Sequence, residues 1–321
     1  MKKQIGKFLS ITIPIFIGVF LIVYQYNKFT PDQIAEMKSH FKTANYFYIY
    51  ISLIIASLGL ASRAYRWKFS IEQMGYESSF YNNLMAVSAG YFMNLGVPRS
   101  GEVSRALILK KYSNIPFDKA FGTIVAERVV DTLIFLLFVI SAFLIEFDVL
   151  KDFILEKIPL QTIEILFGIG FVGLFTALWF WNFSKWKFIL SLKQKLAGLV
   201  EGILSIVKMK NKWAFLFHSF FIWFSYLMMF YITIFALKET NQISFGAVII
   251  AFVFGTFAIG FTNGGFGVFP VLVGQIFVLY LVPVTAGNSL GWLIWTSQTL
   301  FTVLCGGLSF IILPIYNRNR I

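Results

Sequence analysis

Residues 91–131 read YFMNLGVPRSGEVSRALILKKYSNIPFDKAFGTIVAERVVD. This stretch carries a dense group of ionisable side chains within a sequence that is otherwise apolar: Arg99, Glu102, Arg105, Glu127, Arg128 and Asp131. An ionised side chain at membrane depth costs about 2.5–3.5 kcal/mol on insertion scales. The three charges at 127, 128 and 131 would therefore cost one helix about 8–10 kcal/mol if unpaired, whereas each Leu, Ile, Val or Phe returns only about 0.3–0.6 kcal/mol. We expect these charges to face protein, water or a charged ligand.

The composition of the whole chain indicates an integral membrane protein. Its 321 residues are 58% hydrophobic and only 13% charged, whereas soluble domains carry about 25% charged residues. No polar run approaches the length of a soluble catalytic domain, so we expect residues 1–321 to form a single membrane domain. The one cysteine, Cys305, excludes an internal disulfide, and the sequence has no CxxC motif or His/Cys cluster. We therefore predict no metal and no cofactor.

The net charge of +12 reports membrane orientation in our interpretation, and not nucleic-acid binding. Most lysines and arginines fall on one side when the N-terminus is placed inside and both broken segments described below are treated as hairpins. The basic start and long apolar run of residues 1–24 favour a retained signal anchor over a cleaved signal peptide. We predict a multi-pass protein of the bacterial cytoplasmic (inner) membrane with both termini in the cytoplasm.

Apolar segments of suitable length predict an all-α polytopic protein with six full spans. They lie at about 8–24, 46–61, 117–145, 161–181, 213–237 and 286–315. The basic aromatic patch 63–68 is predicted to anchor the second span at the interface, and residues 146–157 are predicted to form an acidic loop. Lysines alternating with apolar residues over 184–212 predict a helix lying on the membrane surface.

Two further apolar segments, 80–112 and 245–282, are interrupted near their middles. The first breaks at Gly96-Val97-Pro98, where proline disfavours helix at the preceding residue. The second breaks in the glycine-rich run 260–270. We expect two re-entrant helical hairpins that enter from opposite sides, with a full span followed by an interfacial helix as the alternative for the first. A faint shared pattern of Gly and Phe around both breaks favours an inverted repeat, as in transporters whose site lies between opposed broken elements.

Three motifs carry a resemblance to a known family: residues 90–94 (GYFMN), residues 98–105 (PRSGEVSR) and residues 127–131 (ERVVD). With them, nearly the whole chain resembles the membrane portion of bacterial lysylphosphatidylglycerol synthase/flippase proteins. The resemblance implies two re-entrant elements and transfer of a lipid with a charged headgroup between leaflets. It also implies a stand-alone member without the soluble aminoacyltransferase domain, so synthase activity is not expected. Many relatives carry Pro-Gly-Gly-x-Gly-x-x-Glu in the second hairpin, whereas residues 262–270 here keep the glycines and have no charge.

The candidate site follows from these motifs. Arginine grips phosphate oxygens in pairs, so Arg99, Arg105 and Arg128 are candidates for binding a lipid phosphate. Glu102, Glu127 and Asp131 would hold the arginines in place or bind a cationic headgroup in a recess open to water. The alternative is an internal salt-bridge cluster that fastens the long helix to the first hairpin. The remaining candidates are the break residues Asn94, Pro98 and Gly101, and the second-loop residues Asn263, Gly264, Gly265 and Gly267, whose backbone could approach a ligand or only pack closely.

Three functions are compatible with these patterns. We favour a membrane translocator, flippase-like and not an enzyme, that moves a charged-headgroup lipid or a lipid-linked precursor between leaflets. An intramembrane lipid-headgroup transferase and a small-solute or ion transporter are the alternatives. Membrane lipids are the expected partners, nucleic acid is not, and a homo-oligomer or a separate lipid-modifying enzyme stays open.

Overall fold

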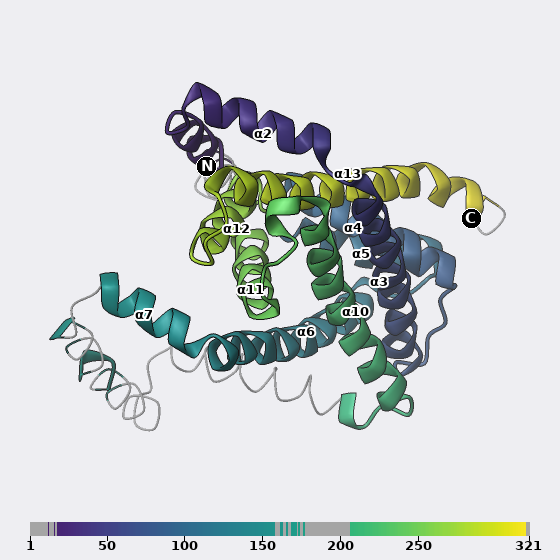
Figure 1. The fold of residues 1–321 in the computed structure, drawn as a ribbon. Helices are drawn as coiled ribbons and strands as arrows, with labels where there is room; N and C mark the ends of the chain where they lie inside the picture. Colours follow the sequence, from purple (N-terminus) through teal and green to yellow (C-terminus); the bar gives the residue numbers. More distant parts are fainter. Residues whose placement is uncertain are drawn as a thin grey trace.

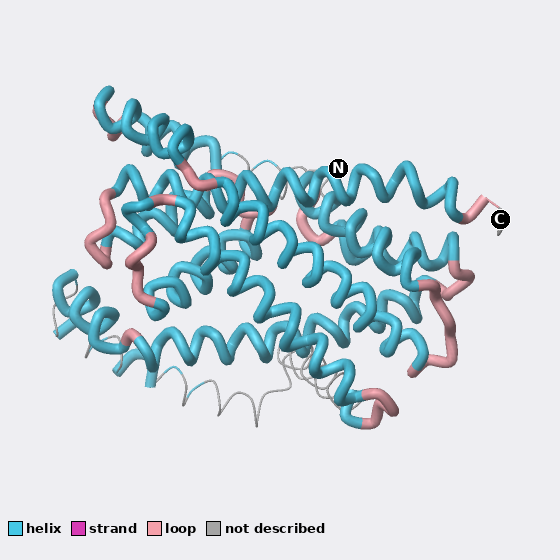
Figure 2. The backbone as a smooth tube through the Cα atoms, turned by 45° about the vertical axis from the view of Figure 1, so that its right-hand side comes forward, coloured by secondary structure: helices cyan, strands magenta, loops and turns pink. Residues whose placement is uncertain are grey.

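The computed structural model describes residues 18–157 and 206–318, together with isolated helical positions at 12 and 16 and between 161 and 176. Throughout these described residues every regular element is a helix (Figures 1 and 2), which confirms the predicted all-α membrane fold. The predicted span at 161–181 and most of the predicted surface helix at 184–212 lie outside the described residues, and the predicted first span lies partly outside them.

The first half of the chain begins with a polar helix and continues with a long helix, two short ones and a second long helix. Thr30 forms a capping box with Gln33 and Pro31 occupies the first turn, which explains why the polar helix starts at this place. The helices are α2 (Pro31–Thr43), α3 (Tyr46–Glu72), α4 (Phe80–Gly96), α5 (Ser100–Tyr112), α6 (Phe117–Ile145) and α7 (Phe147–Lys157).

The second half repeats the order of long, short, short and long helices. Two single 3-10 turns, Ile234–Ala236 and Lys238–Thr240, separate its first two helices. The helices are α10 (Lys212–Thr233), α11 (Phe245–Phe261), α12 (Val268–Val278) and α13 (Val284–Tyr316). Among the described residues, α3, α6, α10 and α13 are long and apolar enough to cross a membrane. Neither α4 nor α11, each of 17 residues, can cross alone, because 17 residues reach only about 26 Å of a hydrocarbon core of about 30 Å.

The helices α4 and α5 form an antiparallel hairpin. At one end the Asn82 amide near the start of α4 donates to the carbonyl of Tyr112 at the end of α5, at 3.4 Å. Nearer the break, the backbones of Gly90 and Gly101 touch, since a Cβ added to Gly101 would collide with the Gly90 carbonyl oxygen. The side-chain oxygen Oδ1 of Asn94 accepts from the Gly101 N–H at 2.7 Å, which satisfies a backbone donor at the start of α5.

The tip between α11 and α12 is built on glycine. Gly264, Gly265 and Gly267 have φ values of 63°, 78° and 70°, a region that glycine enters without steric cost. The Trp295 indole N–H on α13 donates to the Gly264 carbonyl at 2.8 Å, which fixes the tip against the last helix.

The two halves of the chain interlock as equivalent units, α3 to α6 and α10 to α13. Each second short helix packs on the long helix that follows it, α5 on α6 and α12 on α13. Each first short helix packs on the long helix of the other unit, α4 on α13 and α11 on α6. The long helices α13 and α6 lie on opposite sides with the hairpins between them (Figure 1), and α3 packs against α10.

The hairpin tips meet. Gly264 lies so close to Leu95, the penultimate residue of α4, that a Cβ on Gly264 would stand 2.7 Å from the Leu95 side chain. The two hairpins point toward one another from opposite ends of the molecule, because α4 follows the end of α3 and α11 follows the end of α10, and these two long helices are antiparallel. This arrangement agrees with the predicted pair of opposed broken elements and with an inverted repeat.

Two predictions from sequence are wrong. Residues 146–157 were expected to form a loop, but α7 occupies Phe147–Lys157, because apolar residues recur there at the helical period. The patch 63–68 was expected at the interface, but α3 continues to Glu72 with Arg63, Arg66 and Trp67 buried. A helix does not have to end at arginines that are paired inside the protein.

Gly101→Ala is expected to destabilise the fold. The added methyl group meets the Gly90 carbonyl and the Asn94 side chain, and overpacking of this kind costs about 1–3 kcal/mol. The thermal midpoint in detergent should fall clearly. Gly96→Ala, at the end of α4 in the same hairpin, is the matched control, because nothing lies within 4 Å of its Cβ position. Equal shifts for the two variants would contradict the close packing of α4 on α5.

Candidate functional site: a buried ionic cluster with a half-exposed edge

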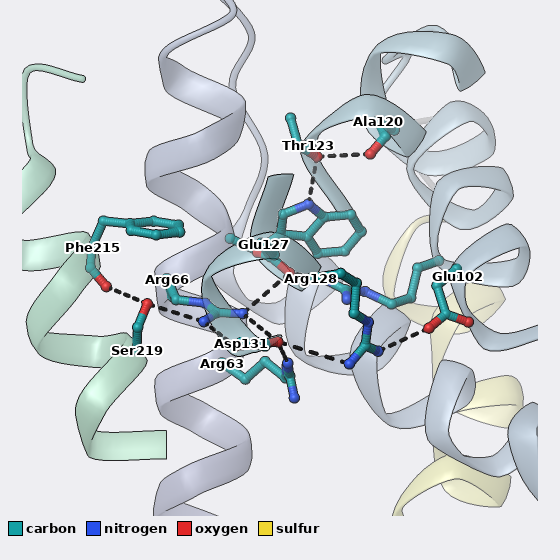
Figure 3. A network of polar contacts seen from close by, with 12 residues as sticks. Arg63, Arg66, Glu102, Ala120, Thr123, Glu127, Arg128, Asp131, Phe215 and Ser219 are labelled. Carbon is teal, nitrogen blue, oxygen red and sulfur yellow. Dashed lines mark hydrogen bonds and ion pairs between the residues drawn. The ribbon is translucent and has the colours of Figure 1, made fainter. Parts of the chain in front are cut away.

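Charged side chains from three helices meet where α3, α5 and α6 cross, with α10 on the far side of α3 (Figure 3). We call this group the ionic cluster. It consists of Arg63 and Arg66 on α3, Glu102 and Arg105 on α5, and Glu127, Arg128 and Asp131 on α6.

Asp131 is the centre of the deepest part of the cluster. It is buried and receives both α3 arginines: Arg63 contacts Oδ2, and Arg66 donates to Oδ1 at 2.7 Å. Arg66 also donates to the Ser219 hydroxyl on α10 at 3.0 Å. Removal of one partner of a buried pair is strongly destabilising because a charge is left uncompensated, so this carboxylate fastens α3 to α6.

Glu127, one turn earlier on α6, holds the first hairpin. It is buried and accepts from Arg105 on α5 at 3.0 Å, with Arg66 3.6 Å away. The Arg105 guanidinium lies 4.0 Å from the centre of the Trp67 ring, a cation–π arrangement. Trp67 in turn donates to the Thr123 hydroxyl at 2.9 Å. Each buried charge at this point therefore faces a charge of the opposite sign.

Arg128 forms the exposed edge of the cluster. Its side chain is 40% exposed, whereas that of Arg66 is 0% exposed. It pairs with Glu102 on the hairpin at 3.0 Å and lies 3.8 Å from Asp131, so it extends from the interior toward the outside (Figure 3). We call Arg128 and Glu102 the rim pair.

A pair of tyrosines extends the polar network toward α4 and α10. Arg63 donates to the hydroxyl of Tyr91 at 2.7 Å and to that of Tyr226 at 3.0 Å, and the two hydroxyls lie 2.7 Å apart. Both are only partly buried, which places the phenols at the edge of the cluster along with the rim pair.

The cluster carries an excess of positive charge. Four guanidinium groups face three carboxylates, so the ionised cluster has a net charge of +1. Within the described part of the chain the Nε atoms of Arg63, Arg66 and Arg105 have no hydrogen-bond acceptor, and Oε2 of Glu102 and Oε1 of Glu127 have no donor. The net positive charge of the cluster would attract an anionic group that reached the rim.

The structure brings together five of the six charged residues singled out from sequence. The exception is Arg99, which is exposed in the left-handed conformation before α5, with φ 61°, and has no ion pair among the described residues. Arg105, Glu127 and Asp131 are buried in pairs and do not line a hydrated recess. Of the five residues that meet in the cluster, only Arg128 and Glu102 have side chains that are partly exposed.

Arg63 and Arg66 were missed by sequence reasoning, which assigned them to the interface. The signal was present in α3, where buried residues recur at spacings of three and four along one face: Ser52, Ala56, Gly59, Arg63, Arg66 and Ser70. A stripe of small and polar residues on an apolar helix marks a buried face in membranes, and both arginines continue it.

The second tip stands apart from these charges. Asn263 is buried, Gly264 meets Leu95, and a Cβ on Gly267 would collide with the backbone of Gly18. Each of these glycines therefore contacts protein. Across the described residues, no group of three or more His, Cys, Asp or Glu side chains is arranged to hold a metal ion.

Comparison with known families agrees with this architecture. The family model described as the lysylphosphatidylglycerol synthase TM region matches residues 11–312. The chain belongs to this family. The residues that match the family model include the ionic cluster and both hairpins of this chain.

One curated relative of this family member is the UPF0104 membrane protein MJ1595 of Methanocaldococcus jannaschii, which is 40% identical over 104 residues. The match covers 30% of this chain and 31% of the relative, so the chain matches less than a third of the relative's length. No solved structure shows a significant match to the chain.

Proposed function

We propose that this synthase TM-region protein is a lipid translocator that moves a phospholipid or lipid-linked precursor between leaflets. The single observation that carries this proposal is the rim pair: a half-exposed arginine at the edge of a buried, net positive cluster, held by a carboxylate on a broken helix. Ionisable groups within spanning helices mark substrate pathways more often than structural sites, and guanidinium groups match phosphate in a paired geometry.

The buried ion pairs have a separate role in this proposal. Asp131 and Glu127 hold α3, α5 and α6 together. The three helices behind the rim pair therefore form a rigid unit. Glu102 competes with an incoming phosphate for Arg128, which keeps the rim occupied when no lipid is present. The acyl chains remain in the bilayer while the headgroup follows the protein surface.

The contact between the hairpin tips supports a gate. A headgroup that crosses the membrane has to pass the level at which Leu95 meets Gly264. In our proposal the two hairpins separate there while the long helices stay packed, as in transporters in which one repeat moves against the other.

The end of the molecule that carries the breaks between α3 and α4 and between α5 and α6 is proposed to be cytoplasmic. The positive-inside rule favours this end, where the described basic residues include Lys68, Lys110, Lys111, Lys119, Lys212 and Arg318. Both termini would then be on the cytoplasmic side of a bacterial inner membrane, with residues 1–321 acting as one membrane domain.

Reconstitution into liposomes tests the proposal. Purified protein is incorporated with fluorescently labelled phospholipids of anionic, zwitterionic and cationic headgroups, and an impermeant quencher reports the appearance of label in the outer leaflet. We expect faster transfer than in protein-free liposomes for at least one headgroup, with no new lipid species by mass spectrometry. Equal rates with and without protein for all three headgroups would reject translocation, and a chemically altered lipid would point to a transferase.

A further inference from the structure

A surface hollow is lined by residues of α3 and α10 together with Phe80 of α4, and neither residue of the rim pair lines it. It is a groove of about 340 Å³ with a nearly apolar lining. Its walls are rings that contact one another, with the Tyr65 ring centre 5.1 Å from that of His218 and 6.3 Å from that of Phe80. Leu58 and Phe217 are exposed along its edges. Packed rings of this kind form a preformed hollow.

The groove lies just inside the hydrocarbon region. Trp213 at the start of α10 is 76% exposed, and exposed tryptophans next to lysines mark the membrane interface. Phe217 and His218 follow it by four and five residues, which is about 6–8 Å along the helix axis. That depth corresponds to the first carbons of an acyl chain, below the headgroups.

A cation stands at the interfacial end of the groove. Lys68 lies three residues beyond Tyr65 on α3, toward the same interface, with its ammonium 5.9 Å from the Tyr65 ring centre. Its contact with Glu72 is 3.5 Å and both side chains are well exposed, so the pairing is weak. At the groove wall itself His218 Nδ1 lies 2.8 Å from the Ser62 hydroxyl, which satisfies the polar atoms inside and leaves an apolar surface for a chain.

We propose that this groove binds one acyl chain of an anionic phospholipid whose phosphate rests on Lys68. The charge of Lys68 at the interfacial end of the groove matches the phosphate of that lipid, and the apolar rings below Lys68 match its acyl chain. The lipid sits behind the ionic cluster, since His218 precedes Ser219, the residue that accepts from Arg66. The site goes beyond the proposed translocation and does not require it, because a lipid bound here is a structural lipid that stays with the protein.

Photo-cross-linking in nanodiscs tests the site. The full chain is placed in discs of equal phosphatidylglycerol and phosphatidylcholine, each in turn carrying a diazirine on one acyl chain, and labelled peptides are mapped by mass spectrometry. We expect labelling by phosphatidylglycerol to concentrate at residues 58–65 and 217–221. It should exceed labelling by phosphatidylcholine about fivefold, which corresponds to about 1 kcal/mol for one basic residue near the surface.

Two variants with matched controls separate the chain from the headgroup. Leu58→Trp covers the groove from an exposed position and should remove the concentrated labelling, whereas Leu304→Trp, exposed on α13, should not. Lys68→Gln should remove the preference for phosphatidylglycerol, whereas Lys119→Gln, exposed at the start of α6, should keep it. An unchanged melting temperature verifies that each variant folds.

Three results would overturn the proposal. They are labelling spread evenly over lipid-facing positions, labelling of the groove without a headgroup preference, and cross-links from the groove to a second copy of the chain in place of lipid. Because no step depends on transport, a protein that fails to translocate lipid can still give the expected labelling, and the reverse also holds.

Discussion

Replacement of Asp131 by asparagine is expected to lower the free energy of unfolding by about 3–5 kcal/mol. The substitution keeps the size of the side chain but removes the charge that faces both Arg63 and Arg66. Both guanidinium groups are buried, and two like charges in a low dielectric repel one another when their shared carboxylate is lost. Equilibrium unfolding in mixed micelles, followed by circular dichroism, measures the change.

Asp118→Asn is the control for this substitution. Asp118 is exposed in the first turn of the same helix, so its loss should change stability by no more than about 0.5 kcal/mol. If Asp131→Asn lowers the free energy of unfolding no more than Asp118→Asn does, the α3 arginines do not depend on Asp131. The buried ion pairs of the cluster would then not be what holds α3 to α6.

Arg128→Gln is expected to slow lipid translocation by roughly 10–150-fold, which corresponds to one charge-assisted hydrogen bond of about 1.5–3 kcal/mol to phosphate. Stability should change little, because the side chain is 40% exposed and Asp131, the more deeply buried of its two partners, keeps its contacts with both α3 arginines. Rates in liposomes that hold equal amounts of folded protein give the measurement.

Two further substitutions show what Arg128 contributes. Arg128→Lys keeps the charge but loses the planar fork that binds two oxygens, so its rate should lie between those of the wild type and the glutamine variant. Lys119→Gln removes a positive charge from the exposed start of the same helix and should leave the rate unchanged. A similar loss for Lys119→Gln would mean that overall surface charge, and not the rim, controls transfer.

Local sequence features predicted the hairpins well. Pro98 and the glycines after residue 260 interrupt apolar runs that are too short to cross, and the structure breaks both helices at these places. Pro116 precedes the long helix Phe117–Ile145, whose bounds agree with the prediction. Such features depend on the backbone preferences of a few neighbouring residues, which is the kind of information that a single sequence carries.

The partners of the charges could not be predicted in the same way. Arg63 and Arg66 lie more than 60 residues from Asp131, and nothing local distinguishes an arginine at the interface from one inside a helix bundle. The depth of each charge likewise depends on which helices cover it. The sequence indicated that residues 99–131 gather charge, but the division into a buried fastener and an exposed rim comes from the packing of α3 and α10.

Comparison of Glu102→Gln with Arg128→Gln in the liposome assay tests the central claim most directly. Both substitutions break the same 3.0 Å ion pair. If Arg128 binds the lipid phosphate, Glu102→Gln releases it from a competitor and transfer proceeds at the wild-type rate or faster, whereas Arg128→Gln abolishes most of the transfer. If both variants lose transfer equally, the pair is only a clasp between α5 and α6, and the claim that the rim binds a headgroup is wrong.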